Sequence, residues 1–274
     1  MAAEGVENEY IGEEDGMNMV PKEPKAARFY MSSKNHKPVV PETGVPPWRE
    51  VASGSGSNTE GASKICSHYL NPINMKVASY LEDTRHMVVK VKDLNRRSAP
   101  LSKSTRLVSV DVVAMYPSIP AEGERGGVEA SRRALDTSGM EAGKVEWVMK
   151  LLKVVLQGNM MEWDGALFLQ CFGTSIRTSC APPYSGIYLE ELVLKTFSLW
   201  EETHPNPEEN MTEWARLIDD GWGLWEGSLN LLRQWLQFMN SQVLSIKFTM
   251  TYTCPKDCPE KSEEEHECRD IVEY

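Results

Sequence analysis

Two widely separated stretches of this 274-residue chain place carboxylates beside strand-like segments. Asp111 lies in the apolar, β-branched segment Leu107–Pro120, which predicts a buried strand. Asp219 and Asp220 lie in Arg216–Trp225, which is typical of a hairpin tip. Three carboxylates from two strand ends could hold two divalent cations, which would stabilise the attacking and leaving oxygens of a phosphoryl transfer. Mg²⁺ suits such a site because it prefers carboxylate oxygens and substrate phosphates.

Each of these carboxylates also has an ordinary structural interpretation. A single Asp at a strand end commonly turns or caps the chain, and an Asp pair before Gly is normal turn chemistry. The metal site requires that the chain fold so that Asp111 lies beside Asp219 and Asp220.

The net charge of −11 is unevenly distributed along the chain. Residues 1–24 and 257–274 each carry a net charge of −6. Residues 25–107 hold fourteen Lys or Arg against six Asp or Glu, a net of +8, whereas residues 108–256 carry −7. A basic region suits phosphate neutralisation, and an acidic region is compatible with a metal site. A chance distribution of surface charges is the alternative explanation.

The composition excludes several classes of protein. The chain lacks an apolar run long enough to span a membrane, and its acidic start lacks the features of a secretory signal. Six cysteines in a chain of this length do not resemble a secreted disulfide framework, so we expect an intracellular, reducing compartment. We expect Cys66, Cys171 and Cys180 to be small packed residues.

The order of predicted elements indicates an α+β fold with an antiparallel sheet backed by helices. We expect a disordered acidic leader at 1–24, a basic region at 25–107, a second region at 108–252 and an acidic tail at 253–274. Periodicity and turn signals predict helices over 62–70, 83–94, 121–135, 142–156, 182–203 and 227–241, hairpins over 159–170 and 214–225, and a strand over 245–252.

Several segments, in order, resemble the reverse transcriptase domain of Penelope-like retroelements, a family related to telomerase. RFYMSSKNHK at 28–37 resembles an early fingers motif, and PWREVASGSGSNTEG at 47–61 and SYLEDT at 79–84 resemble the segments that follow it. DVVAMYPSIP at 111–120, GTSIRTSCAPPYSGIYL at 173–189 and RLIDDGWGLW at 216–225 resemble polymerase motifs A, B and C. The resemblance covers residues 28–252 and implies the fingers and palm of a right-hand polymerase.

The resemblance implies RNA-directed DNA polymerase activity with two Mg²⁺ ions, in which catalysis comes mainly from positioning and charge stabilisation. Asp111, Asp219 and Asp220 would occupy the metal-ligand positions, and the carbonyl of Val112 would add a ligand. Tyr116 would be the steric gate against a ribose 2′-hydroxyl, although a tyrosine before proline can also be an ordinary turn or core residue.

The resemblance also assigns nucleotide and template contacts. Arg49 would contact the triphosphate, with Lys34 or Lys37 nearby, because a planar guanidinium pairs well with phosphate oxygens. An ordinary surface arginine is the alternative for Arg49. The cleft floor under template and nucleotide would be formed by Gly173, Thr174, Ala181 and Pro182.

Motif B departs from the family pattern at two positions. Arg177 replaces a glycine that would allow close approach of nucleic acid, and Gly186 replaces a common asparagine. The side chain of Arg177 would either pair with a phosphate or obstruct the cleft. The alternative function is therefore a catalytically inactive remnant that binds RNA or a protein partner.

The implied partners are an RNA template, a DNA primer and deoxynucleoside triphosphates, with no membrane contact and an oligomeric state that the sequence does not fix. A nuclear location is expected from the resemblance alone. The chain is also expected to lack the thumb, so that processive synthesis would be weak.

A cysteine-rich pattern follows the last predicted strand. Cys254, Cys258, His266 and Cys268 could form a tetrahedral zinc site, although their spacing is not that of common zinc fingers. Unliganded thiols are the alternative.

Overall fold

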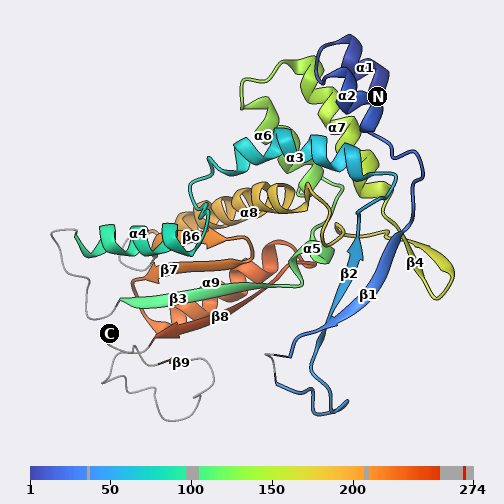
Figure 1. Cartoon of the computed structure of the whole chain (residues 1–274). Helices are drawn as coiled ribbons and strands as arrows, with labels where there is room; N and C mark the ends of the chain where they lie inside the picture. Colours follow the sequence, from blue (N-terminus) through green and yellow to red (C-terminus); the bar gives the residue numbers. More distant parts are fainter. Residues whose placement is uncertain (36–37, 97–104, 207–209, 254–267, 270–274) are drawn as a thin grey trace. The chain divides into compact units, whose positions relative to one another are not determined.

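The computed structural model describes residues 1–274 except 36–37, 97–104, 207–209, 254–267 and 270–274 (Figure 1). The chain divides into two compact units, each built from two separate segments. Unit 1 comprises Met1–Ile73 and Tyr116–Ile187, and unit 2 comprises Asn74–Met115 and Tyr188–Tyr274. The contiguous regions expected from sequence do not coincide with these units, because strands from distant parts of the chain pair within each one.

Unit 2 contains a five-stranded sheet with the order β6-β7-β3-β8-β9. Its strands are β3 (Arg106–Val113), β6 (Met211–Leu217), β7 (Asp220–Trp225), β8 (Lys247–Thr253) and β9 (Cys268–Arg269). The first four pair antiparallel, and β9 adds to β8 in parallel. The expected antiparallel sheet and the aspartate hairpin are thus confirmed.

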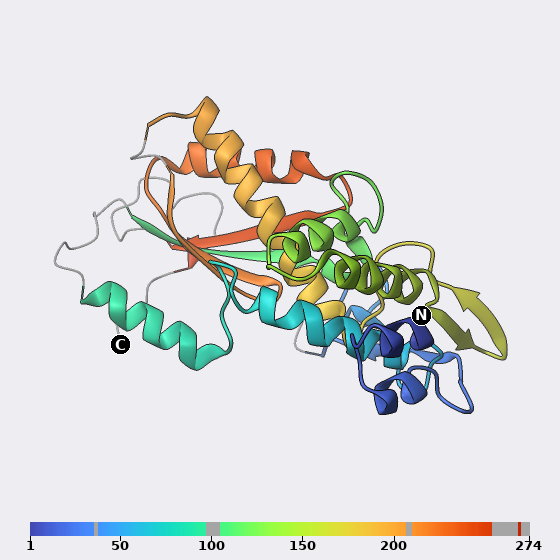
Figure 2. The same cartoon turned by 90° about the horizontal axis from the view of Figure 1, so that it is seen from above.

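Helices cover both faces of this sheet to different extents. Figure 2 shows α4 (Thr84–Asn95) on one side and α9 (Leu229–Gln242), with the part of α8 (Ala181–Thr203) that belongs to unit 2, on the other. Asp83 caps α4 by accepting a hydrogen bond from the His86 amide at 2.9 Å. Ser228 caps α9 in the same way, since its hydroxyl accepts from the Leu231 amide at 3.2 Å.

The two faces of the sheet differ because residues alternate along each strand. In β3, Val108, Val110 and Val112 are buried, while Asp111 is exposed. The predicted buried strand is therefore confirmed for one face of β3, whereas its other face is exposed. On the opposite face, aromatic rings of the helices and strands pack together, with Phe197 5.7 Å from Trp214 between ring centroids.

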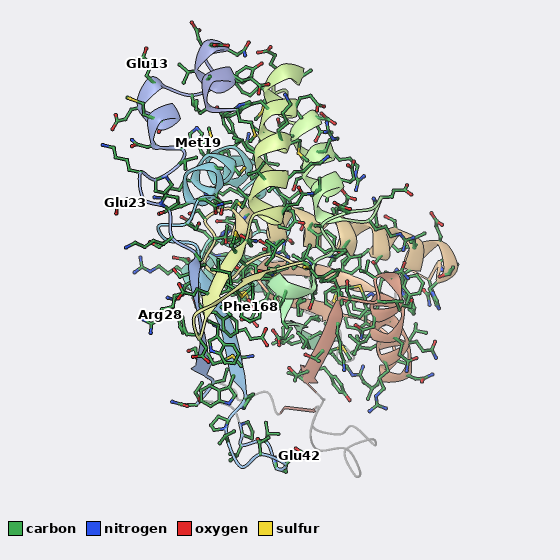
Figure 3. All side chains as sticks on the ribbon, turned by 90° about the vertical axis from the view of Figure 1, so that its right-hand side faces the viewer. Glu13, Met19, Glu23, Arg28, Glu42 and Phe168 are labelled. Carbon is green, nitrogen blue, oxygen red and sulfur yellow. The ribbon has the colours of Figure 1, made fainter. Side chains whose placement is uncertain are left out.

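Unit 1 contains a four-stranded sheet with the order β2-β1-β4-β5. Its strands are β1 (Ala27–Ser33), β2 (Trp48–Ser53), β4 (Met160–Trp163) and β5 (Ala166–Leu169). The predicted hairpin over 159–170 is confirmed as β4–β5, whereas the parallel pairing of β1 with β4 was not expected. Every residue of β5 is exposed, including Leu167 and Leu169. Phe168 of the same strand is labelled in Figure 3.

The helices of unit 1 form its apolar core. They are α1 (Ala2–Glu7), α2 (Glu13–Asn18), α3 (Glu60–Asn74), the short α5 (Met115–Ser118), α6 (Gly127–Asp136), α7 (Ala142–Gln157) and the first part of α8. The helix expected over 121–135 begins six residues later, at Gly127. Trp147, Leu151 and Leu152 of α7 are fully buried. None of the helices in the described part of the chain is long and apolar enough to cross a membrane.

The expectation of a disordered leader over residues 1–24 was wrong. This segment forms α1 and α2, and it contacts α7 through a hydrogen bond of 2.9 Å from Trp147 Nε1 to the Met1 carbonyl. Glu4 pairs with Lys150 at 2.7 Å, and Met19, labelled in Figure 3, is 5% exposed. The acidic composition predicted disorder, but the segment also contains a few apolar and aromatic side chains. Burial of these side chains is enough to hold a short segment against an existing core.

Candidate functional site

The sheet of unit 2 brings two of the three predicted carboxylates directly together. Asp111 of β3 and Asp220 of β7 are opposite each other in the antiparallel register. Directly opposite residues project from the same face, with Cβ atoms about 4.5 to 5.5 Å apart. Both residues are exposed. Two carboxylates so placed can approach the same cation.

The third carboxylate lies on the neighbouring turn. Leu217 pairs with Asp220, so Ile218 and Asp219 form the two-residue loop between β6 and β7. Ile218 has a φ of 59°, in the left-handed region that β-branched residues rarely adopt. Such strain persists only where the surroundings enforce it, and it is concentrated at functional sites.

The sheet face that carries Asp111 is open beside β8. Thr249 is opposite Asp111, and its hydroxyl lies 3.5 Å from the Asp111 carbonyl oxygen. Lys247 and Val113, two pairs further along, are also exposed. Asp111 therefore adjoins an exposed strip of the sheet along β8.

The three carboxylates are the candidate ligands for a divalent cation. Within the described residues, no three or more His, Cys, Asp or Glu side chains are gathered as metal ligands. The site as it stands is the pair Asp111 and Asp220 with Asp219 on the adjacent loop. Carboxylate oxygens fit Mg²⁺ in chemical type, and Mg²⁺ sites usually need only one or two carboxylates plus substrate phosphates.

Val112, predicted to add a carbonyl ligand, is 4% exposed and follows Asp111 in β3. The register of β3 with β7 ends at Asp111 and Asp220, one residue before Val112. On its other side Val112 pairs with Phe248 of β8. Its role as a ligand stays a prediction.

The residues expected to contact the triphosphate lie in unit 1, on the hairpin of β1 and β2. Arg49 is exposed and pairs with Ser32, two residues from the pairing of Tyr30 with Val51. Arg49 and Tyr30 therefore project from the same face of the hairpin. The Lys34 amide donates to the Pro47 carbonyl at 2.8 Å, which extends the hairpin beyond β1. Lys37 lies outside the described residues.

Three predicted site residues meet within unit 1. The Thr174 amide donates to the Tyr116 carbonyl at 2.8 Å. Gly173 has a φ of 73°, and a Cβ there would lie 2.4 Å from the Pro117 carbonyl oxygen. Only glycine fits this close approach without a backbone shift. Motif B is thus held directly against the segment that carries Tyr116.

Arg177 occupies a glycine-like conformation. Its φ is 71°, in the left-handed region, at the position where the resembled family has glycine. Its side chain is exposed, and its guanidinium carbon lies 5.7 Å from the centre of the Tyr30 ring, within cation–π range. Pro182 is exposed near the start of α8.

The cysteines divide into buried, exposed and undescribed groups. Cys66 and Cys180 are buried, but Cys171 is exposed, so its predicted packing was wrong. Burial raises the pKa of both buried thiols, that of Cys180 to about 11. Cys254, Cys258, His266 and the side chain of Cys268 lie outside the described residues, so the zinc prediction stays untested.

Sequence reasoning missed a buried network that adjoins the aspartate turn. Arg216 is 5% exposed and donates through Nη1 to the Ile218 carbonyl at 2.7 Å. Glu190 of α8 lies 3.9 Å from Arg216 Nη2. An arginine between Ala215 and Leu217 in a buried strand was the available signal, because such a charge needs a partner.

No model of a known protein family matches the chain, and no curated protein sequence matches it significantly. Solved structures do match, and their similarity shows that the α+β fold of this chain is polymerase-like.

The similar structures include telomerases and RNA-dependent RNA polymerases. A telomerase from Candida tropicalis, truncated from its C-terminal domain, matches with a TM-score of 0.55 and 10% identity over 88% of this chain and 52% of that one. Telomerase from Candida albicans, in complex with a fragment of telomeric RNA, matches with a TM-score of 0.58 and 8% identity over 86% and 43%. An RNA-dependent RNA polymerase matches with a TM-score of 0.52 and 10% identity over 86% and 21%. The chain thus spans about half the length of these structures or less, and at such identities the likeness shows the fold alone.

Proposed function

We propose that this chain is the RNA-directed DNA polymerase domain of a Penelope-like retroelement. The observation that carries the proposal is the pairing of Asp111 with Asp220 on adjacent strands, beside Asp219 in the loop. The polymerase-like fold and the order of the resembling motifs support it. The substrates would be an RNA template, a DNA primer and deoxynucleoside triphosphates. The similar Candida albicans telomerase is bound to an RNA fragment, which is consistent with an RNA partner.

In this mechanism, Asp111, Asp219 and Asp220 would hold Mg²⁺, with the Val112 carbonyl as an added ligand. When bound, the two ions would supply charge stabilisation for the attacking 3′-hydroxyl oxygen and the leaving phosphate oxygen. The chain's own residues would do the positioning. The exposed strip beside Asp111 would leave room for the primer end.

The candidate residues of unit 1 would bind the incoming nucleotide and select its sugar. Arg49 and Lys34 would bind triphosphate oxygens, since a guanidinium pairs with them through two parallel hydrogen bonds. Tyr116 would exclude a ribose 2′-hydroxyl by steric contact. The Thr174 amide and the close approach at Gly173 hold the Tyr116 segment in place and support this assignment.

Single-nucleotide addition by the purified chain tests the proposal. We expect extension on an RNA template with Mg²⁺, and a loss of about a hundredfold or more for Asp111→Asn or Asp220→Asn. Asp164→Asn is the matched control, because Asp164 is an exposed carboxylate in the β4–β5 turn. Equal rates for Asp111→Asn and the unmodified chain, or no extension at all, would refute the proposal.

A second candidate function is an inactive remnant that binds RNA or a protein partner. The conformation of Arg177 favours this function. Its backbone has a positive φ that is typical of glycine, but it adds a charged side chain that lies over the Tyr30 ring. RNA binding in a filter assay without nucleotide addition by either the unmodified chain or Arg177→Gly would support the remnant.

A further inference from the structure

A buried ionic network in unit 2 links helix α8 to the turn that carries two of the carboxylates. Arg216 of β6 is 5% exposed, and Glu190 of α8 is 6% exposed. Arg216 Nη2 lies 3.9 Å from Glu190 Oε2. Arg216 Nη1 donates a hydrogen bond of 2.7 Å to the carbonyl of Ile218. One guanidinium therefore contacts both the helix and the first loop residue of the turn.

The network is fixed from the other side by Ser79, which is 2% exposed. The Ser79 amide donates to Glu190 Oε1 at 3.3 Å, and its hydroxyl donates to Glu190 Oε2. The backbone of Arg216 is held as well, because its amide donates to the Ser79 carbonyl at 2.7 Å and its carbonyl accepts from the Leu81 amide at 2.9 Å. Neither partner of the ion pair can move far without breaking hydrogen bonds.

Stability alone does not account for this network. Removing two charges from water carries a large desolvation penalty. Apolar residues of similar volume at the same positions often give equal or greater folding stability. Burial lowers the pKa of the Arg216 guanidinium, and the negative charges of Glu190 and Asp219 oppose that effect. What an apolar side chain cannot do is donate to the Ile218 carbonyl. That carbonyl belongs to the residue held at a φ of 59°.

We propose that Arg216 is a positioning residue, which holds the Ile218–Asp219 turn in its strained conformation and so fixes Asp219 and Asp220 relative to Asp111. Glu190 and Ser79 hold Arg216 in turn. The structural part of this inference stands on the fold, whereas its consequence for catalysis rests on the proposed polymerase function.

Hydrogen exchange measured by NMR on the full chain tests the structural part. Arg216→Lys keeps the charge but loses the planar fork, so we expect the Asp220 and Gly221 amides to exchange roughly tenfold faster. Arg106→Lys is the matched control: Arg106 is 9% exposed on β3 and donates to the Gly227 carbonyl at 3.0 Å, away from the turn. Unchanged exchange at both amides in Arg216→Lys would overturn the proposal.

A second variant distinguishes the loss of the positioning contact from the destabilising effect of leaving one buried charge unpaired. Arg216→Met combined with Glu190→Gln removes both charges, and the glutamine oxygen can still accept from the Ser79 hydroxyl. Such neutral replacements of a buried pair commonly fold. We expect this double variant to show faster exchange at Asp220 and Gly221 despite a stable fold. Exchange equal to that of the unmodified chain would contradict a positioning role.

Single-nucleotide addition tests the catalytic consequence. We expect Arg216→Lys to raise the Mg²⁺ concentration for half-maximal rate roughly tenfold, with excess Mg²⁺ restoring the rate and the nucleotide KM unchanged. A loss that Mg²⁺ does not restore would point to a structural role only and overturn this part. If the unmodified chain adds no nucleotide, the proposed function fails, while the exchange comparison still decides whether Arg216 positions the turn.

Discussion

A single methyl group at Gly173 gives a quantitative test of how motif B is held. In Gly173→Ala, the added Cβ would lie 2.4 Å from the Pro117 carbonyl oxygen and 2.5 Å from its carbonyl carbon, so the backbone must shift. The left-handed φ of 73° adds about 1–2 kcal/mol, and overpacking adds about 1–3 kcal/mol. We therefore expect a loss of about 2–5 kcal/mol in the free energy of unfolding.

The control for this prediction is Gly139→Ala. Gly139 has a φ of 80°, but a Cβ there would meet nothing within 4 Å. Only the conformational penalty of about 1–2 kcal/mol applies to it. Urea unfolding followed by far-UV circular dichroism gives both values, and unchanged m-values would support a common unfolding reaction. Equal losses in the two variants would refute the close approach of Gly173 to Pro117.

Two further predictions concern thiols and the departure in motif B. At pH 8, maleimide labelling followed by peptide mapping should modify exposed Cys171 well before Cys66 and Cys180, because burial raises the pKa of both buried thiols and leaves little thiolate. Labelling of Cys180 in the native protein should increase only as the pH approaches its pKa of about 11; rapid labelling at pH 8 would argue against its burial. Arg177→Gly should unfold with a free energy about 1 kcal/mol higher than Arg177→Ala, since both lose the contact with Tyr30 but only glycine relieves the φ of 71°. Equal stability in urea would show that this backbone is not strained.

Local signals in the sequence were sufficient for the elements around the candidate site. The apolar, β-branched run that begins at Leu107 predicted a strand at Asp111, and the Asp219-Asp220 pair before glycine predicted a hairpin tip. The Asp164-Gly165 turn located β4 and β5. These features depend on residues close together in the chain, where turn chemistry and periodicity act directly.

Long-range features were not predictable in the same way. Burial of Arg216 against Glu190 depends on packing between a strand and a helix, and the two residues are more than twenty positions apart in the chain. The parallel pairing of β1 with β4 joins segments more than a hundred residues apart. The contact of residues 1–24 with Trp147 depends on a core formed by later parts of the chain, which the sequence of residues 1–24 does not indicate. Composition and periodicity carry no information about such partners.

The order in which the chain builds its two units has a consequence for inheritance. The polypeptide passes from one unit to the other after Ile73, Met115 and Ile187, so each unit is assembled from both the early and the late part of the gene. A frameshift or premature stop anywhere before residue 188 would leave both units incomplete. Recombination with a breakpoint inside residues 74–187 would likewise alter both units at once, whichever end of the gene was exchanged.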